Sequence, residues 1–210
     1  MPAIDYRNAE GKRLKGVTTI LGNILAKPAL VPWAYKRGKD NLPLYESRDK
    51  AADAGTHAHL MIECHLKGLP DPPIGGLPKD VIDKAESCYL AFLDWEKAHT
   101  FKMVESELSM VSEAFQFGGT IDIGAIVNEL GIVDIKTSKG IYFSMWCQVA
   151  GYGKLYEENR KEKIKGYHIL RLGENGDFSH HYRPSLEKEW EVFLCCLKIQ
   201  NILDETKQKL

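Results

Sequence analysis

Apolar residues in the first half of the chain recur at the spacing of helices. Over residues 79–98 they fall on one helical face, and they are Val81, Ala85, Cys88, Tyr89, Phe92 and Trp95. A longer helix is predicted over 45–67, with Gly68 placed to end it. Upstream, the sequence predicts a short hairpin over 4–17 around "NAEGK" and then two short helices broken near Pro28. We therefore expect residues 1–98 to be mainly helical.

Beyond residue 101 the apolar period changes to that of strands. Alternating or continuous apolar runs predict strands over 102–112, 115–128 and 131–137, and the turn "NELG" would join the last two as a hairpin. A helix over about 142–159, strands in "KGYHILRL" and "FSHHYR", and a helix over about 185–207 follow. This order predicts an α/β (α+β) fold, with a central mixed β-sheet over 99–210 flanked by helices.

Composition narrows the class of protein without naming a partner. The 210 residues are 44% hydrophobic, which is enough for one good core, so we treat 1–210 as a single domain. The formal charge of −1 does not announce a nucleic-acid partner, because binding one would then need a local basic groove.

The cysteines and the N-terminal stretch indicate a reducing compartment. No two of the five cysteines form a C-x-x-C pair, which argues against zinc and iron–sulfur sites and for reduced, mostly buried thiols. The first residues lack the apolar core of a signal peptide, and no stretch approaches the ~20 apolar residues of a membrane span. We expect a cytoplasmic protein with no membrane partner.

Charged residues interrupt the two strands that "NELG" would join. Side chains two apart share a strand face, so Asp134 and Lys136 should point together, away from the core. Asp122, between Ile121 and Ile123, should face away from both. If the strands pair, the two aspartates converge into a hard oxygen site suited to Mg²⁺ or Mn²⁺. Lys136 would add positive charge for a phosphoryl transition state. A solvated hairpin with scattered charges is the alternative.

Two helices contribute further polar candidates. His59 and Glu63 are four residues apart and would share a helical face, although a histidine in this setting, taken alone, is more often an ordinary half-buried residue. Gln148, Tyr152 and Tyr156 form a stripe on the helix that follows the lysine strand. This stripe could pack that helix on the sheet, and a glutamine and a tyrosine one turn apart could also reach a phosphate or a base.

Taken in order, these motifs resemble the PD-(D/E)XK nuclease superfamily. The set is "GTHAH", an acid in a strand, "GTID", "DIKTS" and "QVAGY", and it covers roughly residues 55–160. The likeness is to the branch that contains the nuclease domain of the RecB helicase–nuclease, phage-type exonucleases and the mitochondrial genome maintenance exonuclease. The resemblance implies a restriction-endonuclease-like core with a helical N-terminal region.

Carried over residue by residue, the resemblance implies a metal-dependent catalytic site. His59, Asp122 and Asp134 match the metal ligands, and Lys136 matches the catalytic lysine. The implied cofactor is Mg²⁺ or Mn²⁺. No iron–sulfur cluster is expected, because the spaced downstream trio of cysteines found in cluster-bearing relatives is absent.

Three further positions are implied by the same resemblance. Gln148 and Tyr152 match a motif associated with DNA contact and active-site support. The upstream acid of the site is Glu105 or Glu107, and Glu105 is slightly favoured because "ES" falls where the mitochondrial relative has a similar pair. Ile121 replaces the proline of the superfamily's name, which is a frequent departure.

The N-terminal helices offer a candidate path for DNA. Lys36 and Arg37 could contact phosphates, and Trp33 could stack on unpaired bases, while ordinary surface roles are the alternative for each of them singly. As a group, these helices are expected to form one wall of a channel over the site.

The leading hypothesis is a divalent-metal-dependent DNA exonuclease that acts on single-stranded or linear duplex ends, in phage-type recombination or DNA repair. The alternatives are a structure-specific endonuclease and a catalytically silent DNA-binding accessory protein of the same fold. A recombination partner protein is conceivable under this hypothesis. The polarity, the choice between DNA and RNA, the number of metal ions and the oligomeric state are left open.

Overall fold

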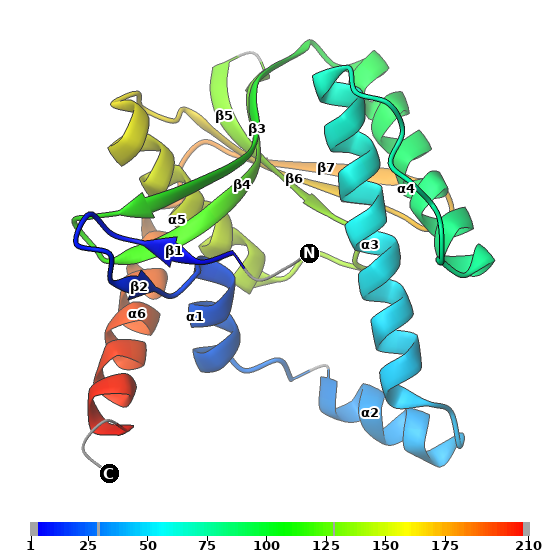
Figure 1. Cartoon of the computed structure of the whole chain (residues 1–210), viewed down its shortest axis with the longest axis horizontal. Coiled ribbons are helices and arrows are strands. Elements are labelled where there is room, and N and C mark those ends of the chain that lie inside the picture. The colour runs from blue at the N-terminus through cyan, green and yellow to red at the C-terminus, as the bar shows by residue number, and fades with distance from the viewer. Residues whose placement is uncertain (1–3, 29, 128, 208–210) are drawn as a thin grey trace.

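Five strands form one mixed sheet, which confirms the fold class expected from the sequence. The computed structural model describes residues 4–28, 30–127 and 129–207. The strand order is β3-β4-β5-β6-β7, in which β5 and β6 run parallel and the other neighbours antiparallel (Figure 1). The bounds are Phe101–Ser112 for β3, Phe117–Val127 for β4, Glu129–Lys136 for β5, Gly166–Leu172 for β6 and Phe178–Arg183 for β7.

Helices precede, interrupt and follow this sheet. The chain begins with a small hairpin, β1 (Tyr6–Arg7) and β2 (Arg13–Leu14), as "NAEGK" predicts. The helices are α1 Val17–Ile24, α2 Leu30–Lys39, α3 Leu44–Lys67, α4 Lys79–Ala98, α5 Phe143–Arg160 and α6 Glu187–Lys207. Gly68 ends α3 in the left-handed conformation (φ 63°), where glycine pays no steric penalty.

The hairpin between β4 and β5 turns more tightly than "NELG" suggests. Val127 pairs with Glu129, and Leu130 pairs with Ile126, so Leu130 already belongs to β5. Asn128, on which the turn prediction also falls, lies outside the described residues. The pairs run from Val127–Glu129 to Ile123–Val133, and this register brings Asp122 next to the part of β5 that carries Asp134.

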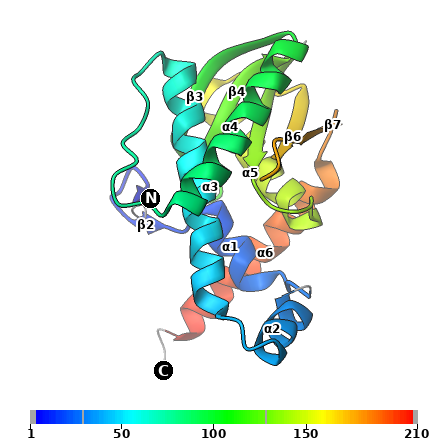
Figure 2. The ribbon, with the colours of Figure 1, turned by 90° about the vertical axis from the view of Figure 1, so that its right-hand side faces the viewer.

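The sheet is covered on both faces. One cluster of buried side chains joins it to α1, α5 and α6, and a second joins it to α3 and α4 (Figures 1 and 2). Trp95 and Phe92 of α4 are completely buried in the second cluster. Burying a side chain of this size contributes about 1.5–3 kcal/mol, so the apolar stripe of α4 is sufficient to hold it on the sheet.

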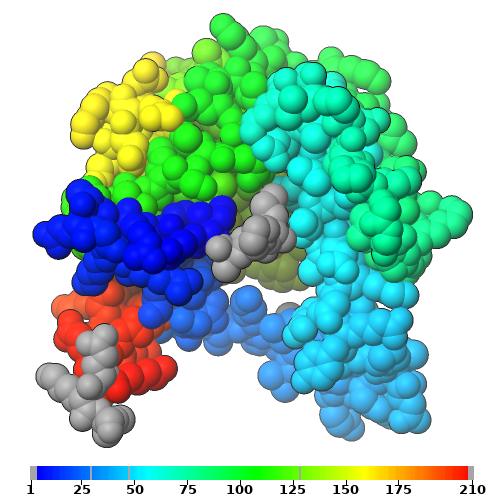
Figure 3. Space-filling model, in the orientation of Figure 1, coloured from blue at the N-terminus to red at the C-terminus, as the bar shows by residue number. Residues whose placement is uncertain are grey.

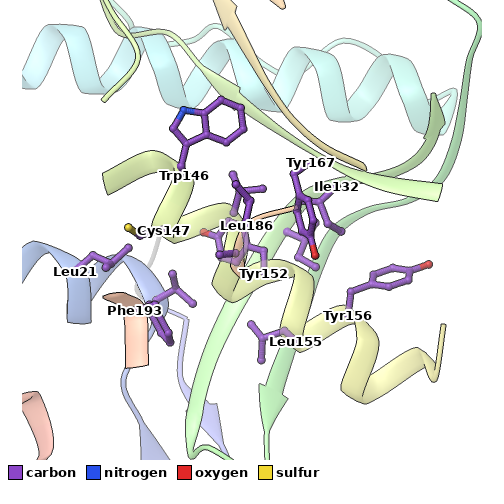
Figure 4. Close-up of a cluster of buried hydrophobic side chains, with 14 of the residues drawn as sticks. Leu21, Ile132, Trp146, Cys147, Tyr152, Leu155, Tyr156, Tyr167, Leu186 and Phe193 are labelled. Carbon is purple, nitrogen blue, oxygen red and sulfur yellow. The ribbon is translucent and has the colours of Figure 1, made fainter. Parts of the chain in front are cut away.

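Helix α5 is buried on nearly every side, because it connects the parallel strands β5 and β6 and is then covered by α1 and α6. Trp146, Cys147, Tyr152, Leu155 and Tyr156 all project from it into the first cluster (Figure 4). A Cβ added at Gly119 of β4 would meet Leu155 Cδ1 at 2.8 Å and Tyr152 Cε1 at 2.9 Å. Glycine there lets α5 lie close to β4, which places Tyr152 over the middle of the sheet.

The buried odd-numbered residues of β4 lie on one side of the sheet before Asp122 and on the other side after it. Phe117 and Ile121 pack in the cluster of α1, α5 and α6, whereas Ile123 and Ala125 pack in the cluster of α3 and α4. The expectation that Ile121 and Ile123 share a face opposite Asp122 is therefore wrong. Simple alternation would keep all four odd-numbered residues on one side of the sheet. The strand is irregular at the residue that carries the carboxylate.

Helix α2 lies apart from both clusters, and no residue of it is buried. Val31 is 74% and Tyr35 75% exposed, and Leu30 and Trp33 are also exposed. Packing within the protein does not account for so much exposed apolar surface on one helix, and such surface commonly marks a binding site. None of the described helices combines the length and the apolar character needed to cross a membrane.

Candidate active site

Three ligand-type side chains from three elements meet at the irregular part of the sheet. His59 comes from α3, Glu107 from β3 and Asp122 from β4, and their ligand atoms all lie within 4.8 Å of one another. His59 Nδ1 is 3.8 Å from Asp122 Oδ1, and these two side chains are 21% and 16% exposed. The three groups are therefore half-buried and close, and they come from residues far apart in the sequence.

Backbone geometry explains why Glu107 joins this cluster. Glu107 has a φ of 50°, a left-handed conformation that few non-glycine residues adopt in a strand. The flanking residues pair regularly, Ser106 with Ile123 and Leu108 with Ile121, so Glu107 stands across from Asp122. Strained backbone of this kind costs about 1–3 kcal/mol and persists where the surroundings hold it in place.

The approach of α3 to the sheet depends on Gly55. A Cβ at this position would lie 2.7 Å from Thr137 Oγ1, just past the end of β5. Glycine allows the helix to run close to the end of the lysine strand, and His59 stands one turn further along the same helix.

A second charged pair lies on β5 beside the first cluster. Lys136 Nζ is 2.5 Å from Asp134 Oδ2, and the Asp134 side chain is fully buried. The two strands are joined at this point by a side chain, since the Ile135 N–H donates to Asp122 Oδ2 at 2.8 Å. Asp122 therefore links the cluster containing His59 to the strand that carries Asp134 and Lys136.

Helix α5 supports the buried aspartate from the other side. Gln148 Nε2 donates to Asp134 Oδ1 at 3.4 Å and to the Tyr152 hydroxyl at 2.8 Å. Gln148 therefore links the Asp134 carboxylate to the Tyr152 hydroxyl, and Lys136 and Gln148 approach that carboxylate from a strand and a helix.

Two carboxyls in this region hold their protons more tightly than usual. Burial raises the pKa of Asp134 to about 7, with Asp122 adding to the shift and Lys136 opposing it. Burial likewise raises the pKa of Glu107 to about 8, reinforced by the charges of Asp122 and Glu63. Burial disfavours the charged form of a carboxyl, and a neighbouring carboxylate shifts its pKa in the same direction.

The histidine shifts in the opposite sense. Burial lowers the pKa of His59, and Lys136 adds to this effect while Asp122 opposes it. A lowered pKa keeps the imidazole neutral, which is the form that binds metal ions. One imidazole nitrogen and two carboxylates are ligand types for a divalent cation, so the residues present fit such an ion.

Glu105 does not take part in the cluster. It forms a bidentate ion pair with Arg160 at the end of α5, with Glu105 Oε1 2.5 Å from Arg160 Nη2. The structure places Glu107 beside His59 and Asp122, so the preference for Glu105 drawn from the sequence is replaced by Glu107. Strand alternation could not separate them, because it puts residues two apart on one face, whereas the positive φ of Glu107 departs from regular strand geometry.

The DNA-contact candidates Trp33, Lys36 and Arg37 lie on α2, away from the carboxylates. Trp33 is 39% exposed, and the Arg37 guanidinium donates to the Pro43 carbonyl at 2.8 Å. In the space-filling view the molecule is hollowed between α1, the linker to α2, and α3 (Figure 3). Lys136 lines a cavity together with residues of α1, of the linker to α2 and of α5.

Comparisons with known proteins add little to this geometry. No family model matches the chain, and no curated protein matches it. Among solved structures, a crystal structure of a "putative exonuclease" from Eubacterium rectale is similar over 75% of this chain and 69% of that chain, at 12% identity and a TM-score of 0.49. A likeness of this size does not assign an activity to this chain.

Proposed function

We propose that the protein is a divalent-metal-dependent nuclease that hydrolyses phosphodiester bonds at DNA ends. The observation that carries this proposal is the meeting of His59, Glu107 and Asp122 within 4.8 Å, next to the ion pair of Asp134 and Lys136. Metal-assisted phosphodiester hydrolysis uses a held cation and a nearby positive charge. The first group offers ligands for the cation, and Lys136 supplies the charge.

Oxygen-rich ligands favour Mg²⁺ or Mn²⁺ over softer metals, although the imidazole of His59 shifts the balance toward Mn²⁺. In this proposal His59, Glu107 and Asp122 hold the ion, and Asp134 adds a further carboxylate. A divalent cation held there would polarise the scissile phosphate and lower the pKa of the attacking water.

The protein's own side chains have distinct roles in this proposal. Lys136 is partly exposed, so its ammonium can reach a phosphate oxygen and offset the charge that develops in the transition state. Asp134 holds that ammonium in place, and Gln148 holds the Asp134 carboxylate through its amide. Tyr152 accepts a hydrogen bond from Gln148 and so orients the amide.

DNA would reach these groups along α2 and α3. The last turn of α2 carries Lys36, Arg37 and Lys39, and Trp33 lies one turn before them. Exposed cations attract phosphates, and exposed aromatic rings stack on unpaired bases. The hollow between α1 and α3 (Figure 3) is one reason to favour a strand end over an internal site in a closed duplex.

A cleavage assay tests the proposal directly. Purified protein is incubated with end-labelled linear single-stranded and double-stranded DNA, and with a closed circle, in Mg²⁺, Mn²⁺ or EDTA. We expect metal-dependent loss of the linear substrates, absent in Lys136→Ala and Asp122→Asn. Glu105→Gln is the control, because it removes a carboxylate of the same sheet that pairs with Arg160 and lies outside the cluster.

The other outcomes of the assay are informative. Cutting of the closed circle would identify an endonuclease. DNA binding without cleavage in either metal would identify a DNA-binding accessory protein and contradict the proposal.

A further inference from the structure

A cavity of about 630 Å³ opens beside the catalytic lysine. It lies between α1, the linker to α2 and the first turn of α5, and Lys136 and Gln148 line it as well. Its volume falls in the range of about 300–1,000 Å³ that is usual for small-molecule sites. Because it shares two residues with the candidate active site, a group bound in it would be continuous with a phosphate at Lys136.

The walls of this cavity are mainly apolar, and its rim is aromatic. Leu21, Leu25 and Met145 contribute aliphatic surface, while Tyr142 and Phe143 line it and are 51% and 53% exposed. Exposed aromatic rings beside a cation form a surface on which a flat, uncharged ring can stack while its phosphate lies in polar surroundings.

We propose that this cavity, which we call the terminal-base pocket, binds the unpaired base of the terminal nucleotide of a DNA strand. The inference rests on the proposed nuclease function and specifies its substrate. The phosphate next to that base lies at Lys136, and the base enters between α1 and α5. A base can enter a walled cavity only after it leaves the stack and its partner, so frayed or single-stranded ends are the substrates.

Apolar walls also set the selectivity of the pocket. Stacking is available to every base, and apolar or aromatic residues make up more of the lining than the polar side chains, which include Thr18, Ser144 and Gln148. We therefore expect similar cleavage of strands ending in any of the four bases, and weaker cleavage where the terminal base is missing.

Gly22 gives a way to fill the pocket without disturbing the fold. It lies within α1 and lines the cavity, and a Cβ built on it meets nothing within 4 Å. Gly22→Phe adds a ring to open space, and a non-glycine residue also suits a helix interior. Gly22→Ala is the matched variant, because it makes the same backbone change with little added volume.

Two readouts test the pocket. The first compares kcat/KM for strands with an ordinary or an abasic terminal nucleotide, in Mg²⁺ or Mn²⁺. For the wild type and Gly22→Ala we expect about a tenfold preference for the ordinary end, as loss of one stacked base implies. For Gly22→Phe the preference disappears.

The second readout needs no cleavage. A single strand carrying 2-aminopurine at one end, or at its centre, is titrated with protein in EDTA, and both ends are tried. We expect fluorescence quenching of the terminal probe by the wild type and by Gly22→Ala, and much less by Gly22→Phe. The central probe responds equally to all three proteins.

The outcomes separate the pocket from the nuclease. Cleavage by the wild type with equal rates for ordinary and abasic ends, and no end-specific quenching, overturns the pocket and leaves the nuclease standing. End-specific quenching that Gly22→Phe abolishes, with no cleavage in either metal, supports the pocket and overturns the hydrolytic function. Absence of both responses overturns both.

Discussion

Glu107 and Asp122 stand across from each other on β3 and β4, between the regular pairs Ser106–Ile123 and Leu108–Ile121. Glu107 has a positive φ, and the inward face of β4 changes at Asp122. Two acids that face each other repel unless a proton or a cation lies between them. Burial raises the pKa of Glu107 and the charge of Asp122 adds to that effect, so a divalent cation bound here would replace a proton.

The first prediction distinguishes the two acids of β3. Glu107→Gln should raise the Mg²⁺ or Mn²⁺ concentration needed for half-maximal cleavage by at least about tenfold, since it removes a carboxylate from the cluster. Glu105→Gln should leave this concentration nearly unchanged, because its partner is Arg160. Metal titrations of the cleavage rate check both, and a larger effect of Glu105→Gln would contradict the placement of the site.

The second prediction concerns pH and metal together. The folded-state pKa values of Asp134 and Glu107 lie above their ordinary values, at about 7 and about 8. At neutral pH the folded state therefore binds protons that the unfolded chain has released, and stability falls as pH rises. In EDTA, urea unfolding should show this loss between about pH 6.5 and pH 8.

Saturating Mg²⁺ should counter that loss, because a cation that binds only the folded state stabilises it more as the carboxyls ionise. Glu107→Gln in EDTA should show a shallower fall, because one titrating group is gone. An equally steep fall in the variant would mean that other groups cause it.

The third prediction concerns a histidine cluster at the far edge of the sheet. His168 Nδ1 and His180 Nε2 lie 2.9 Å apart, and the two rings stack at 5.0 Å. Burial lowers the pKa of each to about 4, and His99, which follows α4, adds to both shifts, as does His181 to that of His180. Tyr182 packs on His168.

Because these pKa values are depressed, the unfolded chain takes up protons before the folded protein does. The stability that the neutral pair contributes is therefore lost as pH falls from about 6.5 to about 4. His180→Phe keeps an aromatic ring and removes the titration, so its stability should decline less over this range. Urea midpoints of the two proteins measure the difference, and parallel curves would exclude the pair as the cause.

The fourth prediction tests α2 as a wall of the DNA path. Lys36→Glu should weaken single-strand binding and make the salt dependence shallower, by about 0.7 in the slope of log K against log salt for each phosphate that is no longer neutralised. Lys163→Glu is the control, because it lies beyond the C-terminal end of α5 while the candidate site lies near the other end. Fluorescence anisotropy at several salt concentrations gives both slopes, and equal slopes for the two variants would exclude α2.

Most of the fold follows from the periodicity of the sequence. The helix predicted over 79–98 is α4, whose apolar stripe packs in the second cluster, and the helix predicted over 45–67 is α3, which Gly68 ends. The strands follow from alternation in the same way. The change of face at Asp122 does not, because alternation assumes regular backbone, and the facing residue of β3, Glu107, has a positive φ.

The candidate site was predictable to a similar depth. His59, Asp122, Asp134, Lys136 and Gln148 come together in the structure, although their chemical roles remain predictions. The choice between Glu105 and Glu107 was beyond the sequence, because it depends on Arg160, which reaches Glu105 from the end of α5. The cavity beside Lys136 was equally hidden, since it is formed by α1, a linker and α5.

The fifth prediction concerns the close approach that places His59. Gly55→Ala should destabilise the protein and reduce cleavage, because the new Cβ would lie 2.7 Å from Thr137 Oγ1 and push α3 away from β5. Gly22→Ala makes the same change inside α1, where nothing lies within 4 Å, and should instead stabilise by about 0.5–1 kcal/mol. Adding Thr137→Ala to Gly55→Ala removes the clashing oxygen and should restore much of the stability that Gly55→Ala removes. Urea unfolding of the wild type, of the single variants Gly55→Ala and Thr137→Ala and of the double variant measures the coupling between the two positions. Additive effects of the two substitutions would show that the contact does not set the position of the helix.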